Sequence, residues 1–418
     1  MRISTNTIYE LGSSTISTLQ SSLTKTQQQI STQRRILTPA DDPIASANIL
    51  AISQSISIND QFASNRQTAK NYLAQQESVL QSVTTLLQDV KTLVVNAGNG
   101  AMEDSQRQYL AAELRGRFEE LLGLANSRDG SGNYMFGGYD IDSQPFSQIP
   151  GGAVYNGDQG KRMLQVGASR QMALNDPGSS VFENMKTGNG RFEVIPTIAN
   201  GSGVIGSSLV LNPTALTGNK YSVEFAVSGT PAITTFTVKN EDYPNRYMDA
   251  GGSWSTYTPP AVPPQIPYVS GEAITFDGMQ FDITGEPAAG DVFTVEPSKR
   301  QSIFATLDKL FTTLSTSSVG AAAEAQLVNG LSAANNNIDN ALDNVLQIRA
   351  SVGTRLKEID SLDSTGEDLN IQYTDAVNEL QEIDLVEAIS NFTQQQIALE
   401  AAQKSFMQIS RLSLFNYI

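Results

Sequence analysis

Hydrophobic residues recur with helical spacing over the C-terminal part of the chain, from about Leu331 to Ile418. They return every seven positions at Leu331, Ile338, Val345, Val352 and Ile359, and at the intermediate position at Ala334, Ala341, Ile348 and Leu362. Arg355 is the one misfit. A heptad repeat held this long predicts a helix packed against another helix rather than against a sheet. We expect a break at Ser364-Thr365-Gly366, after which the pattern resumes.

The N-terminal segment offers a partner for this helix. From about Ile3 to Leu37, apolar residues repeat every seven positions at Ile16, Leu23, Ile30 and Leu37, with Leu19 in between. Both ends of the chain are almost uncharged: only Glu10 and Lys25 between Ile3 and Gln33, and only Glu400, Lys404 and Arg411 between Ala388 and Ile418. A solvated helix face normally carries more charge. We therefore expect the two ends to pair as a coiled coil and to contact neighbouring subunits.

The residues expected at contacts between subunits are apolar side chains of these two helices. They are Ile16, Leu19, Leu23, Ile30, Leu385, Ile389, Phe392, Leu399, Phe406, Ile409, Leu412, Leu414, Phe415 and Tyr417. The alternative is that both helices pack only in the core of a single monomer, since a helical seam is more often core than interface.

Two further helices are expected, at about Ile44–Ala97 and Glu103–Arg128. Asp42 is a good N-cap for the first, and Pro43 suits its first position. Asp41 and Asp42 could instead form a metal or acid–base pair, but no third ligand group lies nearby in the sequence. The segment 129–133 only faintly resembles a calcium loop, because the required Gly and Glu are replaced.

Between about Glu183 and Pro297 the pattern changes to short strands and turns. Tyr221, Val223, Phe225 and Val227 alternate with polar residues, as in a half-buried strand. Asp277-Gly278 lies between two alternating runs and predicts a two-residue hairpin turn. The segment Gly201–Gly206 matches the dinucleotide-binding fingerprint formally, but a strand-like run follows it where that motif needs a helix.

These patterns predict an α+β multidomain protein. Long terminal helices form a coiled coil and a helical bundle, and a β-rich domain is inserted between them. The expected segments are 1–42 (N-terminal half of the terminal coiled coil), 43–182 (N-terminal half of the bundle, with a small β region), 183–297 (inserted β-rich outer domain), 298–384 (C-terminal half of the bundle) and 385–418 (C-terminal half of the coiled coil).

Composition narrows the possible functions. The net charge of −16 argues against nucleic acid as a partner, because phosphate binding needs clustered Lys and Arg. The chain has no His and no Cys, which removes the commonest general base, the thiol nucleophile and the commonest zinc ligands. No catalytic, cofactor-binding or metal-binding residue is predicted. The N-terminus lacks an apolar signal-peptide core, and no run is long and apolar enough to span a membrane.

Several motifs together resemble the bacterial flagellin superfamily, and within it the family of hook-associated protein 3. The first is the long polar helix followed by Arg34-Arg35-Ile36-Leu37-Thr38-Pro39-Ala40-Asp41-Asp42-Pro43. The others are Gly132-Asn133-Tyr134-Met135-Phe136-Gly137-Gly138, Arg349-Ala350-Ser351-Val352-Gly353-Thr354-Arg355-Leu356 and Leu412-Ser413-Leu414-Phe415-Asn416-Tyr417-Ile418. The resemblance covers roughly residues 1–182 and 270–418.

The resemblance implies a structural subunit of the flagellum, without a cofactor, at the junction of hook and filament. The terminal helices would line the central export channel. The expected partners are further copies of the chain, the hook and proximal junction protein below, the flagellin filament above, and an export chaperone on the C-terminal helix. The protein would lie outside the cell, exported by the flagellar type III system without a cleavable signal peptide.

Two alternatives stay open. One is a flagellin proper, which would form long filaments unaided. The other is a filament-type protein with an enzyme in its β insert, where an Asp or Glu pair would have to act without His or Cys.

Overall fold

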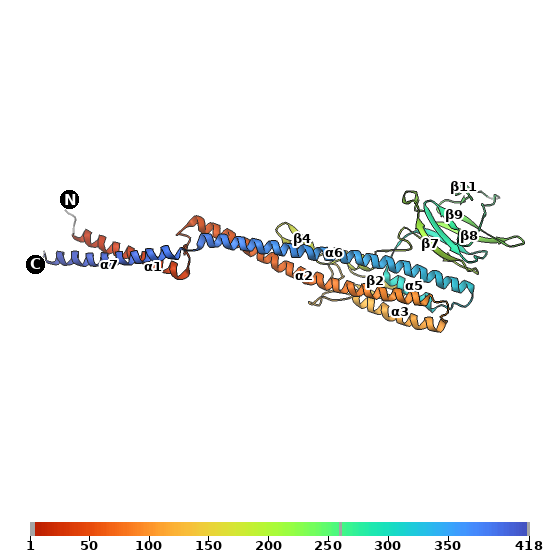
Figure 1. The fold of residues 1–418 in the computed structure, drawn as a ribbon, viewed down its shortest axis with the longest axis horizontal. Coiled ribbons are helices and arrows are strands. Elements are labelled where there is room, and N and C mark those ends of the chain that lie inside the picture. The colour runs from red at the N-terminus through yellow and green to blue at the C-terminus, as the bar shows by residue number, and fades with distance from the viewer. Residues whose placement is uncertain (1–4, 259–260, 416–418) are drawn as a thin grey trace. The chain divides into compact units, whose positions relative to one another are not determined.

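The computed structural model describes residues 5–258 and 261–415. Its helices are α1 (Thr5–Thr32), α2 (Pro43–Ala97), α3 (Asp104–Ala125), α4 (Gly178–Phe182), the short 3-10 helix η1 (Pro213–Ala215), α5 (Ile303–Ser315), α6 (Ala321–Gln381) and α7 (Leu385–Phe415). The architecture is α+β, with long terminal helices and a β-rich insert, as predicted (Figure 1).

The strands before and at the start of the insert are β1 (Phe146–Ile149), β2 (Gly152–Tyr155), β3 (Met163–Gly167), β4 (Arg170–Ala173), β5 (Met185–Lys186), β6 (Phe192–Thr197) and β7 (Val204–Val210). The remaining strands are β8 (Tyr221–Ser228), β9 (Ile233–Asn240), β10 (Arg246–Met248), β11 (Trp254–Thr256), β12 (Ile266–Pro267), β13 (Ala273–Phe276), β14 (Met279–Thr284), β15 (Val292–Pro297) and β16 (Arg300–Gln301).

Contacts divide the chain into two compact units. The first unit contains residues 1–66, 166–169 and 360–418, and the second contains residues 67–165 and 170–359. α2 and α6 each contribute to both units, because they are continuous helices that pass the boundary.

In the first unit, α2 packs against α6 through buried polar contacts. The side-chain amide of Asn59 donates to the carbonyl oxygen of Gly366 at 2.7 Å. Arg66 is buried, forms an ion pair with Asp363, and donates to the carbonyl oxygen of Val166 at 3.1 Å. Polar partners thus satisfy the buried charge of this arginine.

The break expected at Ser364-Thr365-Gly366 is wrong, because α6 continues to Gln381. Gly366 serves a different purpose. A Cβ atom there would lie 2.6 Å from a terminal nitrogen of Arg66. The glycine makes room for the guanidinium, and the helix accepts the modest propensity cost of about 1 kcal/mol.

The second unit is built around a helical bundle of α2, α3, α5 and α6. The apolar heptad positions of α6 are buried as predicted, and they share the core with apolar positions of α2. These residues are Leu331, Ile338, Val345, Val352 and Ile359 of α6, and Leu73, Leu80, Val83, Leu87, Val90 and Val94 of α2. Arg349 binds Glu77 at 2.7 Å and Lys91 binds Asp339 at 2.5 Å, which aligns the two helices in opposite directions.

The misfit at Arg355 has a structural cause. Its guanidinium donates to the carbonyl oxygen of Ala173 at 2.9 Å and forms an ion pair with Asp176. Asp176 also accepts a hydrogen bond from the buried Gln76 at 3.3 Å. Arg355 therefore anchors the segment after β4 to α6.

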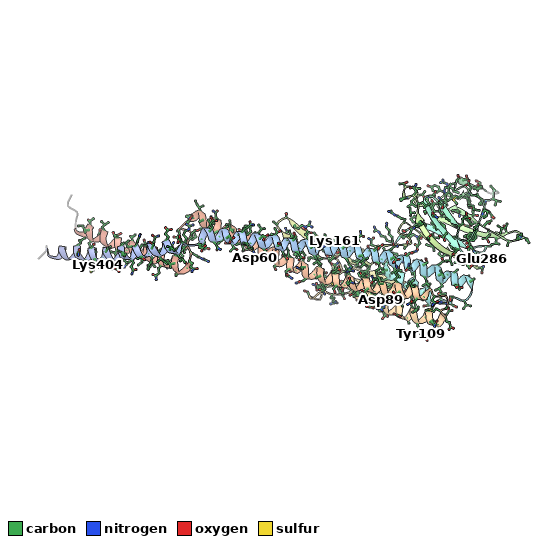
Figure 2. All side chains as sticks on the ribbon, viewed as in Figure 1. Asp60, Asp89, Tyr109, Lys161, Glu286 and Lys404 are labelled. Atoms are coloured by element: carbon green, nitrogen blue, oxygen red, sulfur yellow. The ribbon has the colours of Figure 1, made fainter. Side chains whose placement is uncertain are left out.

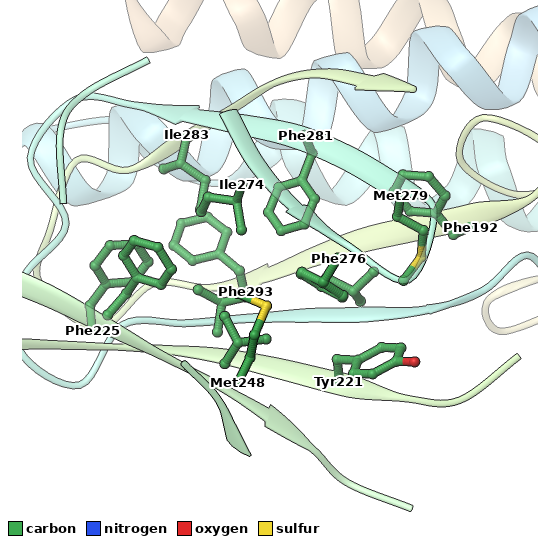
Figure 3. Packing of buried hydrophobic residues seen from close by; sticks show 14 residues of the cluster. Phe192, Tyr221, Phe225, Met248, Ile274, Phe276, Met279, Phe281, Ile283 and Phe293 are labelled. Carbon is green, nitrogen blue, oxygen red and sulfur yellow. The ribbon is translucent and has the colours of Figure 1, made fainter. Parts of the chain in front are cut away.

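The insert is a two-layer β structure. Its larger sheet has the order β11-β10-β9-β8-β15-β6, with β12 also paired to β9, and its smaller sheet has the order β13-β14-β7. Aromatic and aliphatic side chains from both sheets form the core between them (Figure 3). The hairpin predicted at Asp277-Gly278 is confirmed, since Phe276 pairs with Met279 and both turn residues have positive φ, as a type I′ turn requires.

Amide side chains on one face of α6 hold the insert through its backbone. Asn329 accepts from the N–H of Ile205 at 2.8 Å and donates to the carbonyl oxygen of Gly203 at 3.0 Å. Asn340 donates to the carbonyl oxygens of Lys186 and Gly188 at 2.7 and 2.9 Å. Each bond contributes about 1 kcal/mol, so the insert is positioned by several directional contacts.

Gly201 and Gly206 make room for neighbouring carboxylates in the insert. A Cβ atom at Gly201 would clash with the Asp291 carboxylate, and one at Gly206 would clash with that of Asp282. Asp291 is fully buried and accepts hydrogen bonds from backbone N–H groups, including that of Ala199 at 2.8 Å. A strand, β7, follows where the dinucleotide motif needs a helix.

Candidate assembly interface

The terminal helices α1 and α7 lie side by side in the first unit and run in opposite directions (Figure 1). The rings of Tyr9 and Phe406 are in contact, with their centroids 5.0 Å apart. Near the other end of the pair, Arg34 forms an antiparallel bridge with Glu382. A Cβ atom at Gly12 would lie 2.6 Å from the Phe406 ring, so this glycine lets the aromatic side chain enter the seam.

Half of the predicted contact residues lie on α1 or α7 with side chains that are only partly buried in the monomer. They are Ile16, Leu19, Leu23, Ile30, Phe392, Leu399 and Phe406. Three others, Leu385, Ile389 and Ile409, are exposed. α7 runs through Phe415, but the side chains of Leu412, Leu414 and Phe415, and the whole of Tyr417, lie outside the described part of the chain.

Two further apolar side chains of α7, those of Val386 and Ile397, face solvent beside Ile389 and were not among the predicted contact residues. Val386 is 80% exposed, Ile389 is 53% exposed and Ile397 is 63% exposed. Their spacing of three and eight residues places them on one face of the helix. The few charged side chains of α7 include Lys404, labelled in Figure 2. The sparse charge of this segment was the signal that a second apolar face exists.

A joint connects this coiled coil to α2 and α6. Asp42 lies at the N-cap of α2, where its carboxylate accepts from the N–H of Ala45 at 3.0 Å. Asp41 binds Lys25 of α1 at 2.6 Å and accepts from the N–H groups of Leu37 and Thr38. The two neighbouring carboxylates therefore have separate structural partners.

These contacts shift the acidity of both carboxyl groups. The hydrogen bond from Lys25, assisted by the N–H of Thr38, holds the pKa of Asp41 well below its usual range. The N–H of Ala45 and the Arg35 guanidinium lower the pKa of Asp42. Both groups therefore carry their negative charge beside the N-terminus of α2, where the helix dipole favours it.

The sequence pattern did not predict the roles of two residues of the joint, Asp384 and Arg35. Asp384 accepts from the N–H groups of Val386 and Glu387 at 2.9 and 3.2 Å, and so caps the start of α7. Arg35 donates to the carbonyl oxygen of Leu380 at 2.9 Å, and its own N–H bonds to the carbonyl oxygen of Gln381. An Asp directly before a helical run was a local signal for the cap. No local signal in the sequence marked the contact of Arg35, because Leu380 lies 345 residues away.

In the described part of the chain, no Asp and Glu side chains gather in a group of three or more that could hold a metal ion. The carboxylate of Asp129, the first residue of the segment that resembles a calcium loop, accepts from the N–H groups of Ser131 and Asn133. Within residues 5–258 and 261–415, no helix combines the length and apolar character needed to cross a bilayer.

Comparison with known proteins agrees with this architecture. Residues 3–140 match the family described as the bacterial flagellin N-terminal helical region. The chain is 28% identical over 416 residues to flagellar hook-associated protein 3 of Salmonella typhimurium, covering 99% of both chains.

Solved structures of flagellar proteins also resemble this chain. The flagellar junction protein FlgL of Legionella pneumophila is 30% identical, with a TM-score of 0.69 over 81% of this chain and 100% of that one. FlgL of Xanthomonas campestris is 26% identical, with a TM-score of 0.68 over 78% of this chain and 99% of that one. The chain belongs to the flagellar hook-associated protein 3 family of the flagellin superfamily.

Proposed function

We propose that this chain is a structural subunit of the bacterial flagellum that forms the junction between hook and filament. The observation that carries the proposal is the pair of nearly uncharged terminal helices with apolar side chains left exposed, in a chain that matches hook-associated protein 3 along its whole length. An exposed apolar face of this kind marks a surface that a partner covers.

The energetics of α7 favour burial between subunits. Val386, Ile389 and Ile397 would each contribute about 1.5–3 kcal/mol on full burial. The desolvation cost of this burial is small, because the terminal helices carry few charged groups that would lose water. Neighbouring copies of the same chain are the natural partners for a repeated layer.

We further propose a position for the chain in the assembled flagellum. The terminal helices would line the export channel, with the hook and proximal junction protein below and the flagellin filament above. An export chaperone would cover the C-terminal helix, including Leu412, Leu414, Phe415 and Tyr417, before the type III system exports the chain to the extracellular flagellum. Shielding would protect this segment from aggregation, because its sequence is rich in apolar residues.

The protein would act without catalysis. Its relatives are named flagellar hook-associated protein 3 and flagellar junction protein, and the sequence contains neither His nor Cys. A flagellin is the second candidate, because the matching family at residues 3–140 is described by that name. The two differ in assembly, since a flagellin forms filaments unaided.

Deletion of the gene tests the proposal. We expect hooks without filaments by electron microscopy, flagellin released into the medium, and motility restored by the intact gene. Long filaments formed by the purified chain alone would support the flagellin alternative instead.

A point variant tests the interface itself. Ile397→Glu should leave the melting temperature of the monomer nearly unchanged, because the side chain is already exposed, and should abolish motility. Val319→Glu is the matched control, since Val319 is exposed outside the terminal helices. Normal swimming with Ile397→Glu would contradict the assignment of this face.

A further inference from the structure

The outer edge of the insert carries an arginine held between aromatic side chains. β10 and β11 form the last hairpin of the larger sheet, and Figure 1 shows β11 on the side of the sheet away from α6. This short hairpin contains Arg246 and Trp254, and Tyr243 lies in the turn before it. Trp254 is the only tryptophan of the chain.

The Arg246 guanidinium lies against two rings. Its Cζ atom is 5.4 Å from the centroid of Tyr243 and 5.8 Å from that of Trp254. Trp254 is itself fixed, because its indole N–H donates to Asp277 at 3.0 Å. Tyr243 is 50% exposed, so one of the two rings is open to solvent. The cation is therefore positioned in advance, beside an accessible aromatic surface.

The carboxylates near Arg246 in the sequence and the sheet are bound elsewhere. Glu241 accepts from Lys239 and Ser222, Asp242 from the N–H of Lys220, and Asp249 from the N–H of Ser253. Asp277 accepts from Trp254 and Tyr221. Among the residues that the structure describes, none forms an ion pair with Arg246 or accepts a hydrogen bond from its guanidinium. In a chain of net charge −16, this cation remains available to an external anion.

We propose that Tyr243, Arg246 and Trp254 form a binding site for an acidic saccharide, a sugar that carries a carboxylate. The planar guanidinium binds a carboxylate through two parallel N–H bonds. The negative face of an aromatic ring attracts the polarised C–H groups of a pyranose. One ligand that carries a carboxylate beside a C–H face satisfies both features.

An acidic peptide fits the same site less well. A peptide that adds to a sheet needs a row of free backbone N–H and C=O groups along an edge strand. β11 offers three residues. A small rigid ring with an anionic substituent needs only the guanidinium and one aromatic face.

Titration of the full chain with trigalacturonic acid tests the site, with Trp254 fluorescence as the readout and calorimetry beside it. We expect a saturable fluorescence change, weakened by added salt, and no binding of the neutral trisaccharide galactotriose. Arg246→Gln and Tyr243→Ala should each weaken binding at least tenfold. Tyr243 lies in an exposed turn, so its replacement tests the site even if the Arg246 variant unfolds the hairpin.

Tyr257→Ala is the matched control. Tyr257 contacts Tyr247, and strand alternation places this pair on the opposite face of the hairpin from Arg246. Its removal should leave the affinity unchanged. The proposal is overturned if neither readout detects trigalacturonic acid at millimolar concentration, if galactotriose binds equally well, or if the folded Arg246→Gln protein binds like the parent. Tighter binding of hexaglutamate would assign the surface to an acidic peptide instead.

Discussion

At the residue scale, Gly366 is explained by the side chain that packs against it, that of Arg66. The helix around it is unbroken, and the space above its Cα atom is filled by the end of the Arg66 side chain. Arg66 cannot move away cheaply, because Asp363 and the carbonyl oxygen of Val166 hold it. The local sequence suggested a helix break, whereas the contact explains the glycine.

This contact gives a first prediction. Gly366→Ala should lower the free energy of unfolding by about 1–3 kcal/mol, because the new methyl group displaces a buried ion pair. The control is Gly353→Ala in the same helix, where a Cβ atom has nothing within 4 Å. That change should raise stability by about 0.5–1 kcal/mol through helix propensity. Equal denaturant midpoints for the two variants would show that Arg66 does not need the glycine.

A second prediction concerns the buried heptad of α6. Ile338 is fully buried, so Ile338→Asp should cost about 3–5 kcal/mol by placing an unpaired charge in the core. Leu346→Asp is the matched control, because Leu346 is exposed on the same helix and should change stability by no more than about 0.5 kcal/mol. Thermal unfolding followed by circular dichroism measures both. If the Ile338→Asp protein kept the stability of the parent, the burial of Ile338 in the core would be contradicted.

At the scale of elements, the joint between α1 and α2 is held by charged and capping groups rather than by apolar packing alone. Lys25 of α1 reaches Asp41, Asp42 caps α2, and Asp384 caps α7. Three chain segments thus change direction at places where a carboxylate satisfies free backbone N–H groups. The geometry of the joint therefore depends on the ionisation of these groups.

Acid should loosen this joint. The pKa of Asp41 is lowered by Lys25, so the carboxylate stabilises the folded joint at all pH values above its unfolded-state pKa of about 3.9. The stabilisation is lost as the pH falls from there toward the lowered folded-state pKa. Amide exchange at Leu37 and Thr38, which donate to Asp41, should therefore accelerate below about pH 4, relative to intrinsic rates.

The Lys25→Gln variant supplies the control for this measurement. Without the ammonium group, the pKa of Asp41 should rise, and protection of the two amides should be lost at a higher pH. Identical protection curves for the parent, Lys25→Gln and Asp41→Asn proteins would exclude Asp41 as the controlling group.

At the scale of the whole molecule, the β insert leaves and rejoins the helical part at one place. β5 and β16 pair in antiparallel register, with Lys186 opposite Arg300. The α6 side chains that bind the insert, such as Asn337 and Asn340, are amides, so water can replace the insert as their partner. The insert should therefore be removable, although the five-segment division of the chain stays a prediction.

Excision tests this nested organisation. Replacing Thr187–Lys299 by an Asn-Gly dipeptide would close β5 and β16 with a two-residue hairpin turn. The shortened protein should keep its helical circular dichroism, unfold cooperatively, and still restore motility to the deletion strain. Loss of helicity would mean that the bundle depends on the insert.

The sequence by itself determined the elements and the faces they bury. The buried face of α6, which contains Ile338 and Val345, could be predicted from the sequence. A helix that buries one face has apolar residues every three to four positions along the chain. The Asp277-Gly278 turn was also predictable, since only a few residue types adopt positive φ at both positions. For the candidate interface, sparse charge and apolar spacing pointed to α1 and α7, and the intersubunit contacts themselves stay a prediction.

Only the tertiary structure decided which isolated residues serve as contacts between distant segments. Three contacts illustrate this. Gly366 of α6 faces Arg66 of α2, Arg35 binds the carbonyl oxygen of Leu380, which is 345 residues away, and Arg355 binds Asp176, which is 179 residues away. The Arg246 site likewise depends on a turn and a strand that meet in space. A periodic pattern records that a face is buried, but it contains no information on the partner. Such pairings arise only when the folded chain brings complementary groups within hydrogen-bonding or van der Waals distance.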